Sequence, residues 1–165
     1  MTTHRTGPNR RELLMVLGGG AASALLLPTD AWAQGKDAED VAKVTLQVND
    51  GLSYSIRRIE VKAGQTVELT ITHTGKMPKV AMGHNFVLLK QGTKMKAFAN
   101  KAMAAQKTDY IPPSMASAII AHTKLVGGGE SDTITFAAPP PGEYDYLCSF
   151  PGHYSAMNGK LVVEG

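Results

Sequence analysis

Apolar and polar side chains alternate along several short stretches of this chain, and turn residues separate the stretches. Every second residue is apolar over residues 66–72, and residues 44–48 follow the same rule. A two-residue period is typical of strands that bury one face. We also expect strands over residues 56–61, 86–89, 131–136, 142–148 and 160–163. Short strands at this spacing predict an all-β fold, a Greek-key sandwich or barrel.

One stretch departs from this pattern. Residues 94–106 are rich in Ala, Lys and Met, which favour helix, and Pro112 and Pro113 end the stretch. We interpret it as a helical flap inserted between two strands. Met95 and Met103 are eight residues apart and would share one helical face, which we expect to pack on the core.

The first 33 residues have the layout of a secretory signal. Arg10 and Arg11 precede an apolar run over 13–27, and Ala-Trp-Ala follows as a cleavage site. The paired arginines indicate the twin-arginine route. Glycines interrupt the run, and it is shorter than the roughly 20 residues of a membrane-spanning helix, so cleavage near Ala33 is favoured over a retained anchor. We therefore expect a single exported domain over residues 34–165, located in the periplasm.

Charge gives little indication of a partner. Of the chain's 17 basic and 14 acidic residues, three and two lie in the signal, which leaves 14 and 12 and a net charge of about +2. We interpret this charge as too weak and too evenly spread to indicate a nucleic acid or an anionic membrane. Long-range electrostatic steering is not expected.

The chain has one cysteine, Cys148, although exported proteins usually pair their thiols. It would be a buried structural thiol, a free thiol, an intermolecular bridge or a metal ligand. Its neighbours favour a ligand, because His153 follows within a Phe-Pro-Gly loop and Met157 lies four residues further on. A thiolate, an imidazole and a thioether on one loop are donors that copper prefers.

A blue-copper site also needs a second imidazole. His84 is the candidate because it stands just before the expected strand at 86–89. We interpret His73 and His122 as structural or surface histidines, although spacing alone leaves them open as ligands. A structural zinc site would need four Cys or His ligands. A nucleophilic cysteine with a histidine base would need a third, orienting group, and none is apparent nearby.

The pattern Cys-x4-His-x3-Met, with Phe-Pro-Gly between Cys and His, resembles the copper loop of the azurins, which are cupredoxins. The similarity also covers residues 44–50, 73–86 and 120–125 and continues to Val163. It implies an eight-stranded Greek-key fold with the flap and one type 1 copper. The implied equatorial ligands are His84, Cys148 and His153, with Met157 as a long axial ligand.

The resemblance also implies roles for the neighbours of these ligands. The Gly83 carbonyl would be a weak contact opposite Met157. Asn85 would tie the two ligand loops together through Ser149. Backbone N–H groups of Asn85 and Phe150 would point at the Cys148 sulfur and tune the reduction potential.

Members of this family carry single electrons and are not enzymes. The resemblance implies a monomer that docks c-type cytochromes, a nitrite reductase or another respiratory oxidase, with the His153 ring edge as the electron's exit. The implied apolar patch around that edge comprises Leu52, Met77, Ala81, Met82, Phe150, Pro151, Gly152 and Ala156. A periplasmic copper-binding or delivery protein with the same donors is the alternative.

Two departures from the family have consequences. Azurins carry a disulfide whose matching positions here are Ala42 and Gly64. Losing such a bridge typically costs about 2 to 5 kcal/mol, so we expect stability to depend more on the core and on copper. Phe86 occupies the family's buried indole position, and the chain's one tryptophan, Trp32, lies in the signal. The mature protein should therefore contain no tryptophan.

Overall fold

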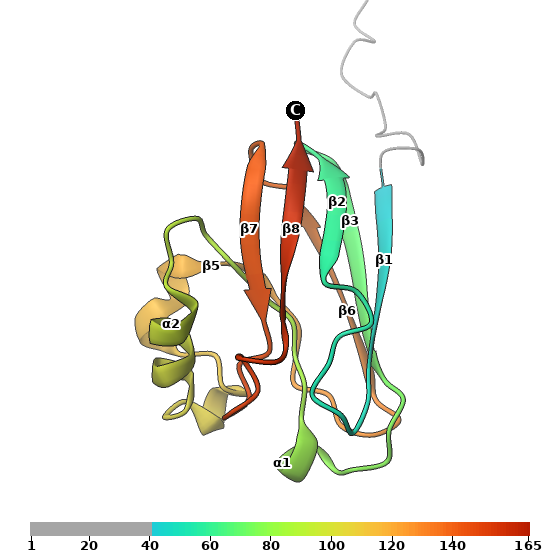
Figure 1. Cartoon of the computed structure of the whole chain (residues 1–165), viewed down its shortest axis with the longest axis vertical. Coiled ribbons are helices and arrows are strands. Elements are labelled where there is room, and N and C mark those ends of the chain that lie inside the picture. The colour runs from blue at the N-terminus through green and yellow to red at the C-terminus, as the bar shows by residue number, and fades with distance from the viewer. Residues whose placement is uncertain (1–40) are drawn as a thin grey trace, which may run out of the picture. The chain divides into compact units, whose positions relative to one another are not determined.

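The computed structural model describes residues 41–165, which form two β-sheets (Figure 1). The predicted signal and cleavage site lie outside the described residues. The smaller sheet has the order β1 (Val41–Val48), β3 (Thr66–His73), β6 (Ser131–Ala137). The larger sheet has the order β2 (Arg58–Lys62), β8 (Asn158–Glu164), β7 (Gly142–Leu147), β4 (Val87–Leu89), β5 (Ile119–His122). These eight strands confirm the predicted all-β fold.

Alternating side chains explain how the two sheets share a core. In β3, Val67, Leu69 and Ile71 are fully buried, while the residues between them are partly exposed. β1 pairs with β3, and β2 with β8, in parallel; the other pairs are antiparallel. Because a strand's side chains alternate between faces, this register keeps one apolar row of each strand inside.

Two elements do not follow from local pattern. β5 has only four residues, with no alternation of burial, and it forms because β4 offers it a pairing edge. A four-residue helix, α1 (Lys79–Met82), precedes the predicted ligand His84 and buries none of its side chains. For β5, pairing with β4 outweighs a weak local preference.

The flap comprises α2 (Met95–Ala102), η2 (Gln106–Thr108) and η3 (Pro113–Ala118). The helix is shorter than expected and packs through Phe98, Ala99 and Ala102. The expected core-facing methionine stripe holds for Met95, which is partly buried against this cluster, but it is wrong for Met103, which is 53% exposed. Within residues 41–165, no helix is long and apolar enough to cross a membrane.

Candidate metal centre

The predicted donors meet at one end of the sandwich, where the loop after β7 turns back into β8. The Cys148 N–H donates to the Met157 carbonyl at 3.0 Å, which closes this loop at its base. Inside it, the His153 and Met157 N–H groups donate to the carbonyls of Phe150 and His153. Gly152 has a φ of +83°, a conformation that favours glycine. The Phe-Pro-Gly sequence therefore directs the turn that returns His153 to Cys148.

Three donor atoms face one another at the spacing of ligands around one ion. The Cys148 Sγ lies 3.8 Å from the His84 Nδ1 and 3.7 Å from the His153 Nδ1, and all three residues are buried. Metal–sulfur and metal–nitrogen bonds of about 2.3 and 2.05 Å put S and N about 3.8 Å apart at 120° and about 3.6 Å apart at a tetrahedral angle. The observed separations of 3.7 and 3.8 Å lie within this range, so the three donors can bind one ion.

His84 reaches this site through contacts from distant segments. Its backbone forms a two-way bridge with Val126, through N–H···O bonds of 3.0 and 2.8 Å. Its ring Nε2 donates to the Asn49 carbonyl at 2.8 Å, so Nδ1 is the unprotonated nitrogen that faces Cys148. Burial lowers the pKa of His84, which keeps the ring neutral.

The protonation states of the other two donors also fit a metal cation. Burial, followed by the neighbouring His84, lowers the pKa of His153 to about 4, so this imidazole is neutral at pH 7. Burial raises the pKa of the Cys148 thiol to about 11, against the opposing effect of the Asn85 and Phe150 N–H groups. Without a cation this sulfur keeps its proton, so the site stabilises a thiolate only when a metal is bound.

Gly83 and Met157 lie beside the three donors. The Gly83 carbonyl oxygen is 3.9 Å from the Cys148 Sγ, and the Met157 side chain is fully buried. A Cβ at Gly83 would stand 2.6 Å from the Lys79 carbonyl and 2.7 Å from the Leu125 side chain. Only glycine allows this backbone to approach so closely.

Asn85 joins the His84 segment to the Cys148 loop. Its Oδ1 accepts from the Ser149 N–H at 2.9 Å, and its Nδ2 donates to the Ser149 Oγ at 2.8 Å. The expected Asn85–Ser149 bond is therefore present. Two further partners were not predicted: Nδ2 also donates to the Asp109 carbonyl, and the Asn85 carbonyl accepts from the Tyr54 hydroxyl. The Tyr54 contact is buried and the Asp109 contact is partly buried, and neither has a sequence motif.

Comparison with known proteins identifies the family. A family model described as "Copper binding proteins, plastocyanin/azurin family" matches residues 41–164. The chain belongs to this family. Copper is its cofactor, and the donors described above suit a type 1 copper site. Family membership makes the chain a copper-binding electron-transfer protein.

Individual relatives agree. Azurin from Achromobacter denitrificans is 42% identical over 126 residues, covering 74% of this chain and 84% of the relative. Outer membrane protein H.8 from Neisseria meningitidis serogroup B is 40% identical, covering 72% of this chain and 66% of the relative. The structure of auracyanin A, a "blue" copper protein from Chloroflexus aurantiacus, matches with a TM-score of 0.67 and 33% identity, covering 75% of this chain and 99% of that one.

In this cupredoxin, the flap contacts the site through a turn with unusual backbone geometry. Asp109 and Tyr110 have φ values of +54° and +61°, which are uncommon for residues with side chains. The turn directs the Asp109 carbonyl to Asn85 and the Tyr110 ring against Phe150, with ring centroids 5.0 Å apart. Phe150 in turn lies 4.6 Å from the His153 ring.

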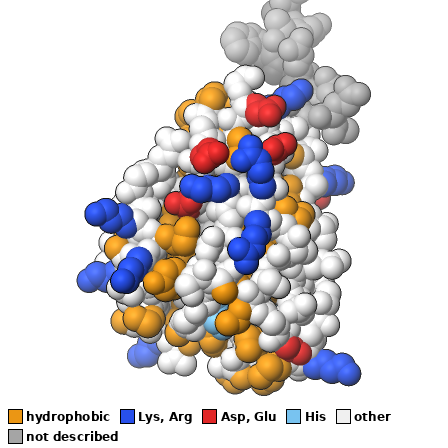
Figure 2. All heavy atoms as spheres, in the orientation of Figure 1, with side chains coloured by type: hydrophobic (Ala, Val, Ile, Leu, Met, Phe, Trp, Pro, Cys, Tyr) orange, Lys and Arg blue, Asp and Glu red, His pale blue; other side chains and the backbone are white. Residues whose placement is uncertain are grey.

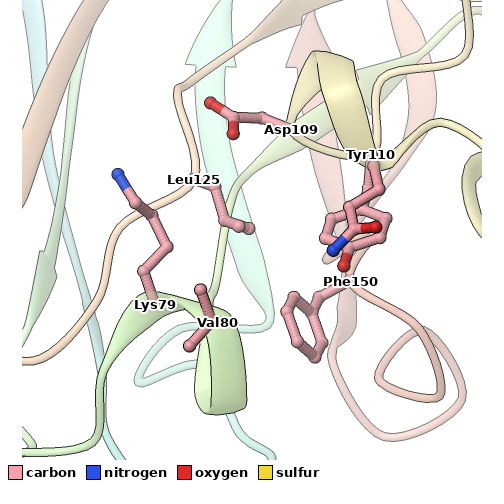
Figure 3. Close-up of a pocket in the computed structure, with 7 residues that line it drawn as sticks. Lys79, Val80, Asp109, Tyr110, Leu125 and Phe150 are labelled. Carbon is pink, nitrogen blue, oxygen red and sulfur yellow. The ribbon is translucent and has the colours of Figure 1, made fainter.

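A pocket of about 170 Å³ lies between α1 and this turn (Figure 3). Lys79 and Val80 extend into it from α1, and Asp109 and Phe150 line other sides. None of the predicted copper ligands lines it. The pocket therefore marks the seam between the flap and the ligand end, not the metal site.

The remaining histidines of the described chain have other environments. His73 is buried and its ring stacks on His84, with centroids 5.0 Å apart. Its Nδ1 accepts from the Gly75 N–H, and its Nε2 donates to the Met82 carbonyl, so both ring nitrogens are occupied. His122 is exposed on β5. Neither adds a donor to the cluster around Cys148.

Proposed function

We propose that this protein carries single electrons between redox proteins, with one copper held by His84, Cys148 and His153 and, weakly, by Met157. The Gly83 carbonyl would be a further weak contact. The observation that carries the proposal is the trio of buried donor atoms, with S–N separations of 3.7 and 3.8 Å. Copper bound there supplies a one-electron Cu(I)/Cu(II) couple.

The protein's own contribution is to hold these donors in one arrangement. An electron carrier works best when its ligands barely move between oxidation states. Here the Asn49 carbonyl fixes the His84 ring, and Asn85 links that segment to Ser149. The Asn85–Ser149 bonds are buried and the His84–Asn49 bond is partly buried, and together they preorganise the ligands before copper binds.

His153 would be the electron's exit. His153 as a whole residue is 6% exposed. Within residues 41–165 its Nε2 has no hydrogen-bond partner, and no fully buried side-chain nitrogen lacks one, so this atom reaches the surface. The resemblance implies an apolar patch around this edge, and two of its residues, Leu52 and Met77, are 42% and 38% exposed. Figure 2 shows a small histidine surface enclosed by hydrophobic side chains at this end of the molecule. Such a patch suits brief docking of a redox protein, such as a c-type cytochrome or a nitrite reductase.

Copper delivery with the same donors is the competing function. Delivery requires that an acceptor displace the ligands one at a time. The burial of all three donors and the closed loop from Cys148 to Met157 oppose such exchange. The geometry therefore supports electron transfer over metal transfer.

We also infer that residues 1–33 are a twin-arginine export signal and that the domain over 34–165 works in the periplasm. The support is the residue pattern alone, since these residues lie outside the described part of the chain. The intact mass of protein recovered from the periplasm should begin near Gln34. Its fluorescence should lack indole emission, because Trp32 is the only tryptophan; a retained indole band would contradict cleavage.

Optical and EPR spectra of the copper-loaded protein test the function. We expect a strong visible thiolate-to-Cu(II) band that ascorbate abolishes. Cys148→Ser should lose the band entirely, whereas His122→Ala, a matched surface control, should keep it. A colourless copper-loaded protein would refute the type 1 site. Rapid loss of copper to a chelator, with slow electron self-exchange, would favour delivery instead.

A further inference from the structure

The net positive charge of the described chain is concentrated on the flap. Residues 1–40 hold four of the chain's 17 basic and five of its 14 acidic residues, which leaves 13 and nine in residues 41–165. The flap and its entry, residues 90–118, hold five basic residues and one acidic residue, so the rest is balanced at eight and eight. The expectation of evenly spread charge is therefore wrong.

These flap lysines are exposed, and none of them forms an ion pair with another residue of 41–165. The five are Lys90, Lys94, Lys96, Lys101 and Lys107. Within residues 41–165, every ion pair closer than 4.0 Å joins other residues. Figure 2 shows the contrast: blue side chains stand apart from red ones over the flap, while both colours intermingle on the upper face. Elsewhere in the described chain, ion pairs of 2.7 to 3.9 Å join Arg58, Lys160, Glu143 and Asp145.

The charged flap adjoins the electron's proposed exit. Tyr110 of the flap contacts Phe150, and Phe150 contacts His153. η2, which carries Lys107, lies just before Tyr110, and Gln106 of η2 lines the same pocket as Phe150. A protein docked over His153 would therefore meet the flap at its rim.

We propose that the flap lysines form a docking rim for an acidic redox protein, one that carries carboxylates around its exposed redox centre. This inference rests on the proposed electron-transfer function. Unpaired lysines beside an apolar patch raise the encounter rate with a negatively charged partner and orient it, while the apolar patch supplies the contact. An anionic membrane is less suited, because it would cover the exit that the partner must reach.

The test compares two charge-reversal variants of the copper-loaded protein. The flap variant is Lys96→Glu with Lys107→Glu. The control is Lys43→Glu with Lys62→Glu, which changes the net charge equally at the start of β1 and the end of β2, away from the ligand loop (Figure 1). Stopped-flow mixing measures electron transfer to two cytochromes c, one with carboxylates and one with lysines around the haem edge, across ionic strengths.

With the acidic cytochrome at low salt, the flap variant should react at least about tenfold more slowly than wild type, and the control less than about threefold more slowly. The basic cytochrome should reverse the order, and high salt should remove both differences. Equal effects of the two variants would overturn the proposal. So would flap-dependent sedimentation with phosphatidylglycerol vesicles without any change in the cytochrome rates.

Failure of the electron-transfer function itself is recognised separately. A wild-type protein that does not exchange electrons with hexacyanoferrate would refute that function. In that case, NMR titration with the acidic cytochrome still tests docking, because it needs no electron transfer. Shifts at α2 and η2 amides that disappear in the flap variant would support the rim, and their absence from the wild type would reject it.

Discussion

Polar groups have opposite environments at the ligand end and on the flap of this cupredoxin. At the ligand end, His84, Asn85 and Ser149 are buried, and their hydrogen bonds join strands and loops that are far apart in sequence. On the flap, five lysines are exposed and unpaired among the described residues. Neutral, fully partnered groups hold a geometry, because leaving any of them unpaired is costly. Exposed charges do not fix the positions of neighbouring groups, but they attract or repel approaching molecules.

The two regions meet at one turn, where the Asp109 carbonyl of the flap accepts a hydrogen bond from the Asn85 side chain. Substitutions at the ligand end should therefore lower the free energy of unfolding strongly, and substitutions on the flap should lower it little. Four experiments test that division, beginning with the largest expected effect.

Removing the Asn85 side chain should destabilise the protein most. Asn85→Leu leaves the buried Ser149 N–H and Oγ without their partner, which should lower the free energy of unfolding by about 3 kcal/mol. Urea denaturation of the copper-free protein measures this value. Ser149→Ala, which keeps the backbone bond to Oδ1, should cost roughly half as much. Equal and small losses would show that the brace is not a stabilising element.

Acid should destabilise the copper-free protein through His153. Its pKa is about 4 when folded and 6.5 as the ordinary value, so between these pH values the unfolded chain binds a proton that the folded chain does not. The free energy of unfolding should therefore fall from pH 6.5 towards pH 4, by on the order of 2 kcal/mol.

The window from pH 6.5 to 5 separates His153 from the carboxylates, whose lowered pKa values act at lower pH. In that window His153→Gln should reduce the slope, and His84, whose pKa burial also lowers, should account for the slope that remains. The exposed His122→Gln should leave the slope unchanged. Denaturant midpoints measured every half pH unit give the slopes. A slope that His153→Gln does not change would assign the effect to another group.

Two buried tyrosines provide a matched pair for the next effect. Tyr54 donates to the Asn85 carbonyl and Tyr146 to the Ile56 carbonyl, so each change to Phe removes one hydroxyl bond. Each should cost about 1 to 1.5 kcal/mol. Only Tyr54→Phe should also shift the reduction potential, because the Asn85 N–H points at the Cys148 sulfur. Voltammetry compares the two, and equal shifts would deny Asn85 this role.

Changes to flap lysines should have the smallest effect on stability. Lys96→Ala and Lys101→Ala remove exposed charges without partners, so the free energy of unfolding should change by less than about 0.5 kcal/mol. Thermal unfolding monitored by circular dichroism checks this. A larger loss would mean that the flap charges support the fold, which would remove the contrast between the two regions.

Much of the fold could be predicted because strands leave a local signature. Residues 66–72 alternate, and β3 covers Thr66–His73 with its apolar row buried. The predicted helix of the flap was too long. Composition indicates helix preference, but the end of the helix depends on packing through Phe98 and Ala102, which composition does not show. β5 escaped prediction because its four residues gain their strand conformation from β4.

The sequence by itself determined the local half of the copper site: Cys148, His153 and Met157 belong to one short loop, whose covalent length and Gly152 bring them back together. Only the tertiary structure decided the rest. The Val126 bridge and the Asn49 carbonyl present His84 to Cys148, and Tyr54 and Asp109 reach Asn85 from other segments. The physical reason is separation along the chain. The length of a short loop limits how far apart its own residues can lie, whereas residues far apart in sequence meet only through strand register and packing.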